Sequence, residues 1–132
     1  MRAIAATAGA VLSLWAAPVA SAETVVLPER PGEPGAVFVD NAAIIDPHPM
    51  PAESYSRVPG DRGVMLRFTT GTPTCYGVHA TVVESAEVVS VELRGGTLPE
   101  AVGRACIMIA VSGTVEVALQ SPLGDRQVVS VY

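Results

Sequence analysis

The sequence contains no lysine, so its eight basic residues are all arginine. Thirteen acidic residues outnumber them and give a formal net charge of −5. The arginines are scattered along the chain, and no basic cluster is present that would release counterions from nucleic acid or hold an anionic lipid surface. This composition argues against nucleic acid as a partner.

Histidine is scarce as well, with only His48 and His79 in the chain. A hydrolase must bring a nucleophile, a base and an orienting acid together, and no Gly-x-Ser-x-Gly elbow is present. A glycosidase needs two facing carboxylates, whereas the acidic residues here are spread over expected turns and solvent faces. We therefore predict no catalytic residues. A small secreted enzyme of the hydrolase type remains the alternative function.

Metal binding is a second alternative, because Cys75 and His79 share one face of an expected strand. A blue-copper site uses two histidines, one thiolate and a weak axial methionine. The further ligands available are His48, Met50, Met65 and Met108. Cys106, however, offers Cys75 a disulfide partner. Asp40 and Asp46 could bind a calcium ion together with backbone carbonyls, but their spacing matches no EF-hand loop. We predict no metal and no cofactor, and keep a copper-binding β-sandwich as the less favoured alternative.

The N-terminal 22 residues have the pattern of a secretory signal peptide. Arg2 is followed by an apolar stretch that is shorter than the ~20 residues of a bilayer span. Pro18 and the small residues Ala20-Ser21-Ala22 then form a cleavage site, which we place between Ala22 and Glu23. The protein is predicted to be secreted or extracytoplasmic, in the cell envelope, with no stable membrane insertion after cleavage.

Cys75 and Cys106 are the only cysteines. In an exported protein two thiols normally oxidise, and within one chain they have only each other as partners. A redox-active pair is the alternative, but no Cys-x-x-Cys motif is present. We predict a structural disulfide.

The mature chain is long enough for one small domain. Residues 23–35 carry many prolines and glycines, which predicts an extended, mobile lead-in. Residues 36–132 are predicted to form a single β-domain, in which Asp46 to Pro51 is a stiff, polyproline-like connection.

Alternating apolar residues after Ser54 predict a series of short strands separated by Gly/Pro turns. Gly95 is expected to open a loop that runs to about Arg104, and Cys106 to Val111 to form a central strand that is covered on both faces. Ser112-Gly113 is expected to be a tight turn. The fold class predicted is all-β: a small antiparallel β-sandwich or barrel-like domain with one disulfide.

The segment Pro122-Leu123-Gly124-Asp125 is predicted to be a turn before the last strand. Leu123 is expected to reach back to the core, Gly124 to take a positive φ, and Asp125 to bond the turn backbone. Arg126 is expected to pair with Asp125 or Glu116.

Several of these segments resemble a module of exported actinobacterial proteins, of the mycobacterial type, that occurs both as small secreted proteins and in cell-envelope lipoproteins. The resemblance covers roughly residues 44–131. Its most specific parts are the two cysteine segments and the Pro-Leu-Gly-Asp-Arg turn. It implies an extracytoplasmic β-domain with a Cys75–Cys106 bridge and carries no established activity. A lipobox cysteine is lacking, so the resemblance implies no membrane anchor.

The function predicted is an exported, non-catalytic binding or interaction module of the envelope or the extracellular space. Its partner is expected to be a protein or a glycan, and the module itself a monomer. Tyr55, beside the proline-rich segment, is one candidate for a contact surface. A convergent pocket with perturbed titratable groups would favour the enzyme, and a flat apolar patch would favour the module.

Overall fold

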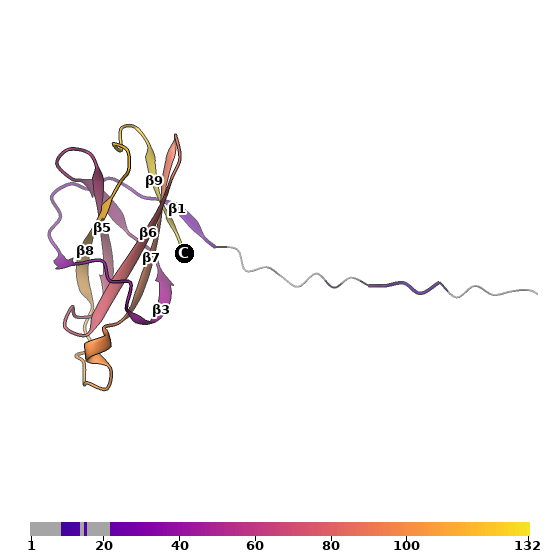
Figure 1. Cartoon of the computed structure of the whole chain (residues 1–132), viewed down its shortest axis with the longest axis horizontal. Helices are drawn as coiled ribbons and strands as arrows, with labels where there is room; N and C mark the ends of the chain where they lie inside the picture. The colour runs from indigo at the N-terminus through magenta and orange to yellow at the C-terminus, as the bar shows by residue number, and fades with distance from the viewer. Residues whose placement is uncertain (1–8, 14, 16–21) are drawn as a thin grey trace, which may run out of the picture.

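The computed structural model describes residues 9–13, 15 and 22–132 of the chain. Most of the predicted signal peptide, residues 1–22, lies outside the described residues. From Glu23 onward the chain forms two β-sheets that pack face to face around one core (Figure 1). Within the described ranges no α-helix occurs, and the one helical element is a single 3₁₀ turn. The predicted all-β class is confirmed.

The first sheet has five strands, in which β1 pairs with β9, and β9 and β3 pair with successive parts of one edge of β7. β6 pairs with the opposite edge of β7. The second has four strands in the order β2-β8-β5-β4. The elements are β1 (Thr24–Val26), β2 (Ala36–Phe38), β3 (Ile45–Met50), β4 (Ser54–Arg57), β5 (Gly63–Thr70), β6 (Tyr76–Glu84), β7 (Val88–Thr97), η1 (Pro99–Ala101), β8 (Val111–Ala118) and β9 (Gln127–Val131).

The strand pairing is mixed rather than purely antiparallel. Five of the described pairings are antiparallel, while β2 with β8 and β7 with β9 are parallel. The parallel pairs join strands that are distant in the sequence, and such pairs leave no hairpin signal along the chain. For this reason the sequence pattern predicted strands and turns but not their relative directions.

The core lies between the sheets and is built from the alternating apolar positions of the strands. Val64, Leu66 and Phe68 of β5 and Val89, Val91 and Leu93 of β7 are fully buried. Phe38 and Phe68 pack edge to face with ring centroids 5.2 Å apart. These residues occupy every second position of their strands, as the alternation predicts.

The lead-in of residues 23–35 begins with β1, which forms part of the first sheet, and turns at Pro31 and Gly32. Glu23 exchanges backbone hydrogen bonds with Tyr132, and β1 pairs with β9. Leu27 is buried in the core. The first residues of the lead-in therefore add a strand and a core side chain to the domain, because β9 has a free edge for them and the core has room for Leu27.

The proline-containing connection at residues 46–51 is also part of a sheet. Residues 45–50 form β3, an edge strand that pairs with β7 through an irregular register. Proline lacks a backbone donor, and an edge strand tolerates this because one side of the strand has no partner. β7 in turn extends through Gly95 and Gly96, which were predicted to open a loop. A side chain at Gly96 would lie 2.7 Å from the Ile45 carbonyl oxygen, so glycine allows β3 to approach.

The prediction of a buried central strand at residues 106–111 is wrong. β8 begins only at Val111, whose partner Thr70 is the last residue of β5. The chain turns after Thr70, so the residues before Val111 have no strand to pair with. Ser112 and Gly113 form no turn and lie inside β8.

The Pro-Leu-Gly-Asp-Arg turn forms as predicted, with two changes in its partners. Leu123 is fully buried and Gly124 has a φ of 56°. The Gly124 N–H donates to the Asp61 carboxylate rather than to Asp125. Arg126 pairs with Glu84, and not with Asp125 or Glu116. The sequence could not indicate these partners because they come from distant segments, Asp61 from the turn before β5 and Glu84 from the end of β6.

Leu123→Ala is expected to lower the free energy of unfolding by about 2–5 kcal/mol, because it removes a fully buried side chain and leaves a cavity. Urea unfolding followed by circular dichroism measures the change. The control is Val83→Ala on β6, where the side chain is 71% exposed and the expected effect is within ~0.5 kcal/mol. Equal effects of the two substitutions would show that the turn is not anchored in the core.

Candidate functional site

The Cys75–Cys106 disulfide forms as predicted. It joins the residue before β6 to a long connection, residues 98–110, that crosses from the first sheet to the second. The Leu98 N–H donates to the Cys75 carbonyl, and the Arg104 guanidinium donates to the Thr74 carbonyl. The connection is thus held against the turn before β6 at three points.

An exposed group of aliphatic side chains lies on this connection. We call it the apolar loop patch. Its members are Val102, Ile107, Met108 and Ile109, with exposed fractions of 60, 67, 90 and 52%. Met108 is the most exposed of the large apolar side chains within residues 22–132. The connection projects from one end of the two-sheet body, where it is drawn in orange in Figure 1.

The chain around Met108 is irregular and unpaired. Residues 105–110 contain neither a turn nor a bend. The backbone groups of residues 105–109 form no hydrogen bond with any described residue. Exposed aliphatic residues on an unpaired backbone are the features of a segment that is open to pairing with another chain.

Two open hollows flank this segment. One, of about 420 Å³, lies between it and the start of β3, and the other, of about 390 Å³, lies against the turn after β5. Tyr76 and Met108 line both. The segment therefore has open space beside it in both hollows.

The two histidines are not brought together. His48 on β3 is in register with Gly95, and His79 on β6 is in register with Arg94, so the two rings belong to opposite faces of the sheet. His79 Nδ1 lies 2.9 Å from Asp40 Oδ1, which also accepts the Ala80 N–H. His79 lies on β6, which among the described strands pairs with β7 alone and so forms an edge of the first sheet.

The disulfide also bears on the copper alternative. Because Cys75 is bonded to Cys106, its sulfur is not available as the thiolate that a blue-copper site requires. In the part of the chain that the structure describes, no three residues among His, Cys, Asp and Glu cluster in a way that would hold a metal ion. Asp40 Oδ1 is hydrogen-bonded to His79 and to the Ala80 N–H. Asp46 lies apart from Asp40, at the hollow beside Met108.

Tyr55 does not form a contact surface. It lies on β4 and is buried, and its backbone bonds to Pro28 and Arg30 of the lead-in. Burial, together with the nearby Glu29 carboxylate, raises the pKa of its hydroxyl. The proline-containing lead-in of residues 23–35 thus packs, at Pro28 and Arg30, on the edge of the second sheet.

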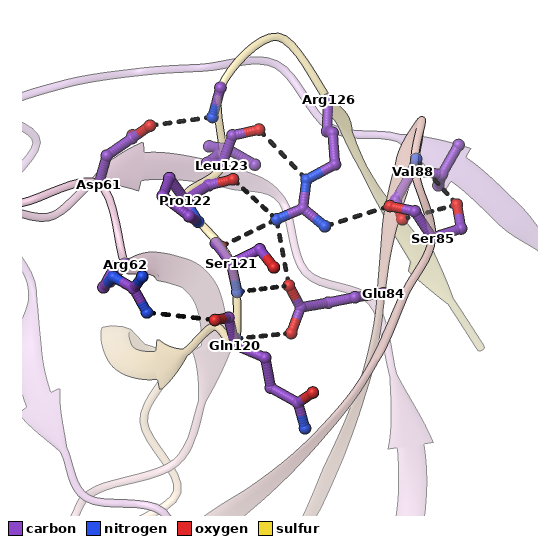
Figure 2. Close-up of polar contacts among 11 residues, drawn as sticks. Asp61, Arg62, Glu84, Ser85, Val88, Gln120, Ser121, Pro122, Leu123 and Arg126 are labelled. Carbon is purple, nitrogen blue, oxygen red and sulfur yellow. Dashed lines mark hydrogen bonds and ion pairs between the residues drawn. The ribbon is translucent and has the colours of Figure 1, made fainter.

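A second cluster, which we call the polar clasp, lies at the far end of the sheets from the apolar loop patch (Figure 2). Arg126 pairs with Glu84 at 3.1 Å and donates to the carbonyls of Ser121 and Pro122 at 2.9 Å. Glu84 accepts the backbone N–H groups of Gln120 and Ser121. Asp61 binds the Gly124 N–H and Arg57. The clasp fixes the turn before β9 to the turn before β5 and to the end of β6.

The carboxylates of the clasp are fully engaged. The Gln120 N–H, with help from Arg126, lowers the pKa of Glu84. The Gly124 N–H, followed by Arg57, lowers the pKa of Asp61. A hollow of about 430 Å³ borders Glu84 and Arg126, but a carboxylate with a lowered pKa and both oxygens bonded is a poor general base. The clasp is structural.

No protein-family model, curated protein or solved structure matches this chain. Within the described residues no helix has the length and apolar character needed to cross a bilayer.

Sequence reasoning found the disulfide but missed the apolar loop patch. It placed residues 106–111 in the core because a run of apolar residues is typical of a covered strand. A run of this kind does not say whether a neighbouring strand is available, and here β5 ends at Thr70.

The clasp predicts a pH dependence of stability. Because the folded-state pKa of Glu84 is lowered, its contribution is fully present above the unfolded-state value, about 4.3, and is lost as the pH falls through the folded-state value. Glu84→Gln is expected to reduce stability at pH 7 and to flatten its decline between about pH 5 and pH 3. Chemical denaturation at each pH measures this. Glu100→Gln, on the exposed η1 turn, is the control, and an unchanged slope in Glu84→Gln would refute the assignment.

The disulfide predicts a separate effect. The double variant Cys75→Ser, Cys106→Ser is expected to lose about 3.5–4 kcal/mol of stability in the chain-entropy model, because the bridge closes a loop with a sequence separation of 31. Hydrogen exchange should quicken most at Leu98 and Arg104, whose amides donate to the carbonyls of Cys75 and Ala101. If β4 and β5 lose protection equally, the bridge does not act on this connection in particular.

Proposed function

We propose that this protein is an exported, non-catalytic binding module that acts outside the cytoplasm as a monomer, and that the apolar loop patch is its contact surface for a protein partner. The observation that carries the proposal is the exposure of Ile107, Met108 and Ile109 between a disulfide and the start of β8. Consecutive large aliphatic side chains exposed in this way mark an interaction site.

Two features support export. The disulfide is a bond that persists in oxidising compartments outside the cytoplasm. The first residue after the proposed cleavage site, Glu23, is also the first of the described residues that bonds to the folded domain, through Tyr132. Cleavage after Ala22 would release the domain without removing any of its strands.

The distribution of titratable groups favours a module over an enzyme. Glu84 and Asp61, the carboxyls with a shifted pKa, are bonded within the polar clasp, far from the apolar loop patch. Asp40 pairs with His79 and also accepts a hydrogen bond from the Ala80 backbone N–H. An acyl-transfer site needs a hydroxyl or thiol at the second histidine nitrogen, and no described residue bonds His79 Nε2.

A protein is favoured over a glycan as the partner. The patch consists of aliphatic side chains, which gain by burial against another apolar surface, at roughly 1.5–3 kcal/mol for a fully buried residue. Sugar hydroxyls buried there would lose their hydrogen bonds to water without replacement. We further propose an actinobacterial source of the exported type, which the sequence resemblance supports.

Cross-linking in the producing organism tests this function. A photoreactive benzoylphenylalanine at Met108 is expected to give a discrete covalent adduct with one protein. The same residue at Val83, an exposed apolar position on β6, is the control. Mass spectrometry identifies the adduct and, from the N-terminus of the mature chain, the cleavage site. Equal labelling at the two positions, or none at Met108, would contradict the proposal.

A further inference from the structure

The segment around Met108 combines four features. It runs without a turn or bend over residues 105–110, its backbone is unpaired over residues 105–109, it carries no charge, and it is fixed at both ends. One end is Cys106, bonded to Cys75, and the other is Val111, paired with Thr70 on β5. Only four residues lie between these two anchors.

An active-site cleft of an endopeptidase binds a chain of this form. Such clefts pair with the backbone of an extended segment and receive one side chain in a specificity pocket. We propose that the partner of the apolar loop patch is a serine endopeptidase with an apolar specificity pocket, which this protein binds as a substrate-like inhibitor through Met108. The inference rests on the proposed function and names the class of its partner.

Met108 is the side chain suited to the pocket. It is 90% exposed and unbranched, so it can enter a deep slot. Its neighbours Ile107 and Ile109 are branched at Cβ and stiff, which favours contacts along the rim. The hollows on both sides of the segment leave room for the walls of a cleft to approach it.

The two anchors explain why the segment would inhibit an endopeptidase rather than serve only as its substrate. Attack by the enzyme's serine on the Met108 carbonyl forms an ester, breaks the Met108–Ile109 peptide bond, and passes the serine proton through the enzyme's histidine to the new Ile109 amine. The disulfide holds the acyl side and β8 holds the amine side. The amine therefore remains beside the ester, and its attack reverses the step, frees the serine and competes with water.

The anchors also reduce the entropy lost on binding. A free peptide must be ordered when it enters a cleft, whereas a segment already held between two fixed points loses less conformational freedom. Arg104 adds a third restraint, because it donates to the Thr74 carbonyl beside Cys75.

An inhibition assay with purified enzymes tests the inference. The oxidised protein is mixed with chymotrypsin or subtilisin, and hydrolysis of a chromogenic peptide is followed. We expect inhibition that rises with dose and saturates at equimolar protein, with trypsin little affected, because its pocket carries an aspartate. The protein recovered from the complex should be largely intact or cut only between Met108 and Ile109.

Met108→Lys is the decisive variant. It should weaken inhibition of chymotrypsin by about 30-fold or more, the effect of removing a central anchor, and create inhibition of trypsin. Val83→Lys makes the same change of charge at an exposed site on β6 and should leave the profile unchanged. Since Met108 is exposed, thermal unfolding of its variant should match that of the wild type.

Three results would overturn the inference: no inhibition of either apolar-pocket enzyme, rapid cleavage of the segment without inhibition, or a Met108→Lys profile equal to that of the wild type. Cross-linking at Met108 separates these from failure of the proposed function. An adduct with a protein that is not a peptidase would preserve the binding module and reject the inhibitor. No adduct together with no inhibition would reject both.

Discussion

The ten residues of β7 pair with three other strands, and the arrangement of the whole domain follows from this. Along one edge β7 pairs with β6, and along the other with β9 near its start and with β3 near its end. Val89, Val91 and Leu93 point from this strand into the core and are fully buried. Gly95 and Gly96 continue the strand where β3 and its Met50 side chain come too close for another residue.

The position of β7 decides what the next part of the chain must do. β7 belongs to the first sheet and β8 to the second, so the connection between them has to cross one end of the domain. This connection ends at Val111, which pairs with Thr70, the last residue of β5. The residues just before Val111 consequently lie outside both sheets, and the disulfide is what keeps them near the body. The exposed segment is thus a consequence of the topology and not of local sequence preference.

Local features of the fold could be predicted from the sequence, and features that depend on distant partners could not. The alternation in β5, the turn at residues 122–125 and the disulfide were all predicted, because each has a signal within a few residues or depends on a unique pair. The parallel pairing of β2 with β8, the sheet role of Thr24–Val26 and the partner of Arg126 depend on contacts between distant segments. The same limit hid the candidate site, since an apolar run such as Ile107 to Ile109 has the same composition in a core and on a surface.

An exposed aliphatic segment with an unpaired backbone is a hazard in most β-proteins, because it can template pairing between identical chains. Several features of this domain oppose that outcome. The unpaired stretch is only about five residues long, it is anchored at both ends, and Arg104 precedes it directly. The protein as a whole carries a net negative charge, which adds repulsion between copies. A rigid recognition loop must be accessible to the cleft of a partner and protected from pairing with other copies of the same chain. A region selected only for packing would have no reason to leave the Met108 side chain exposed to water.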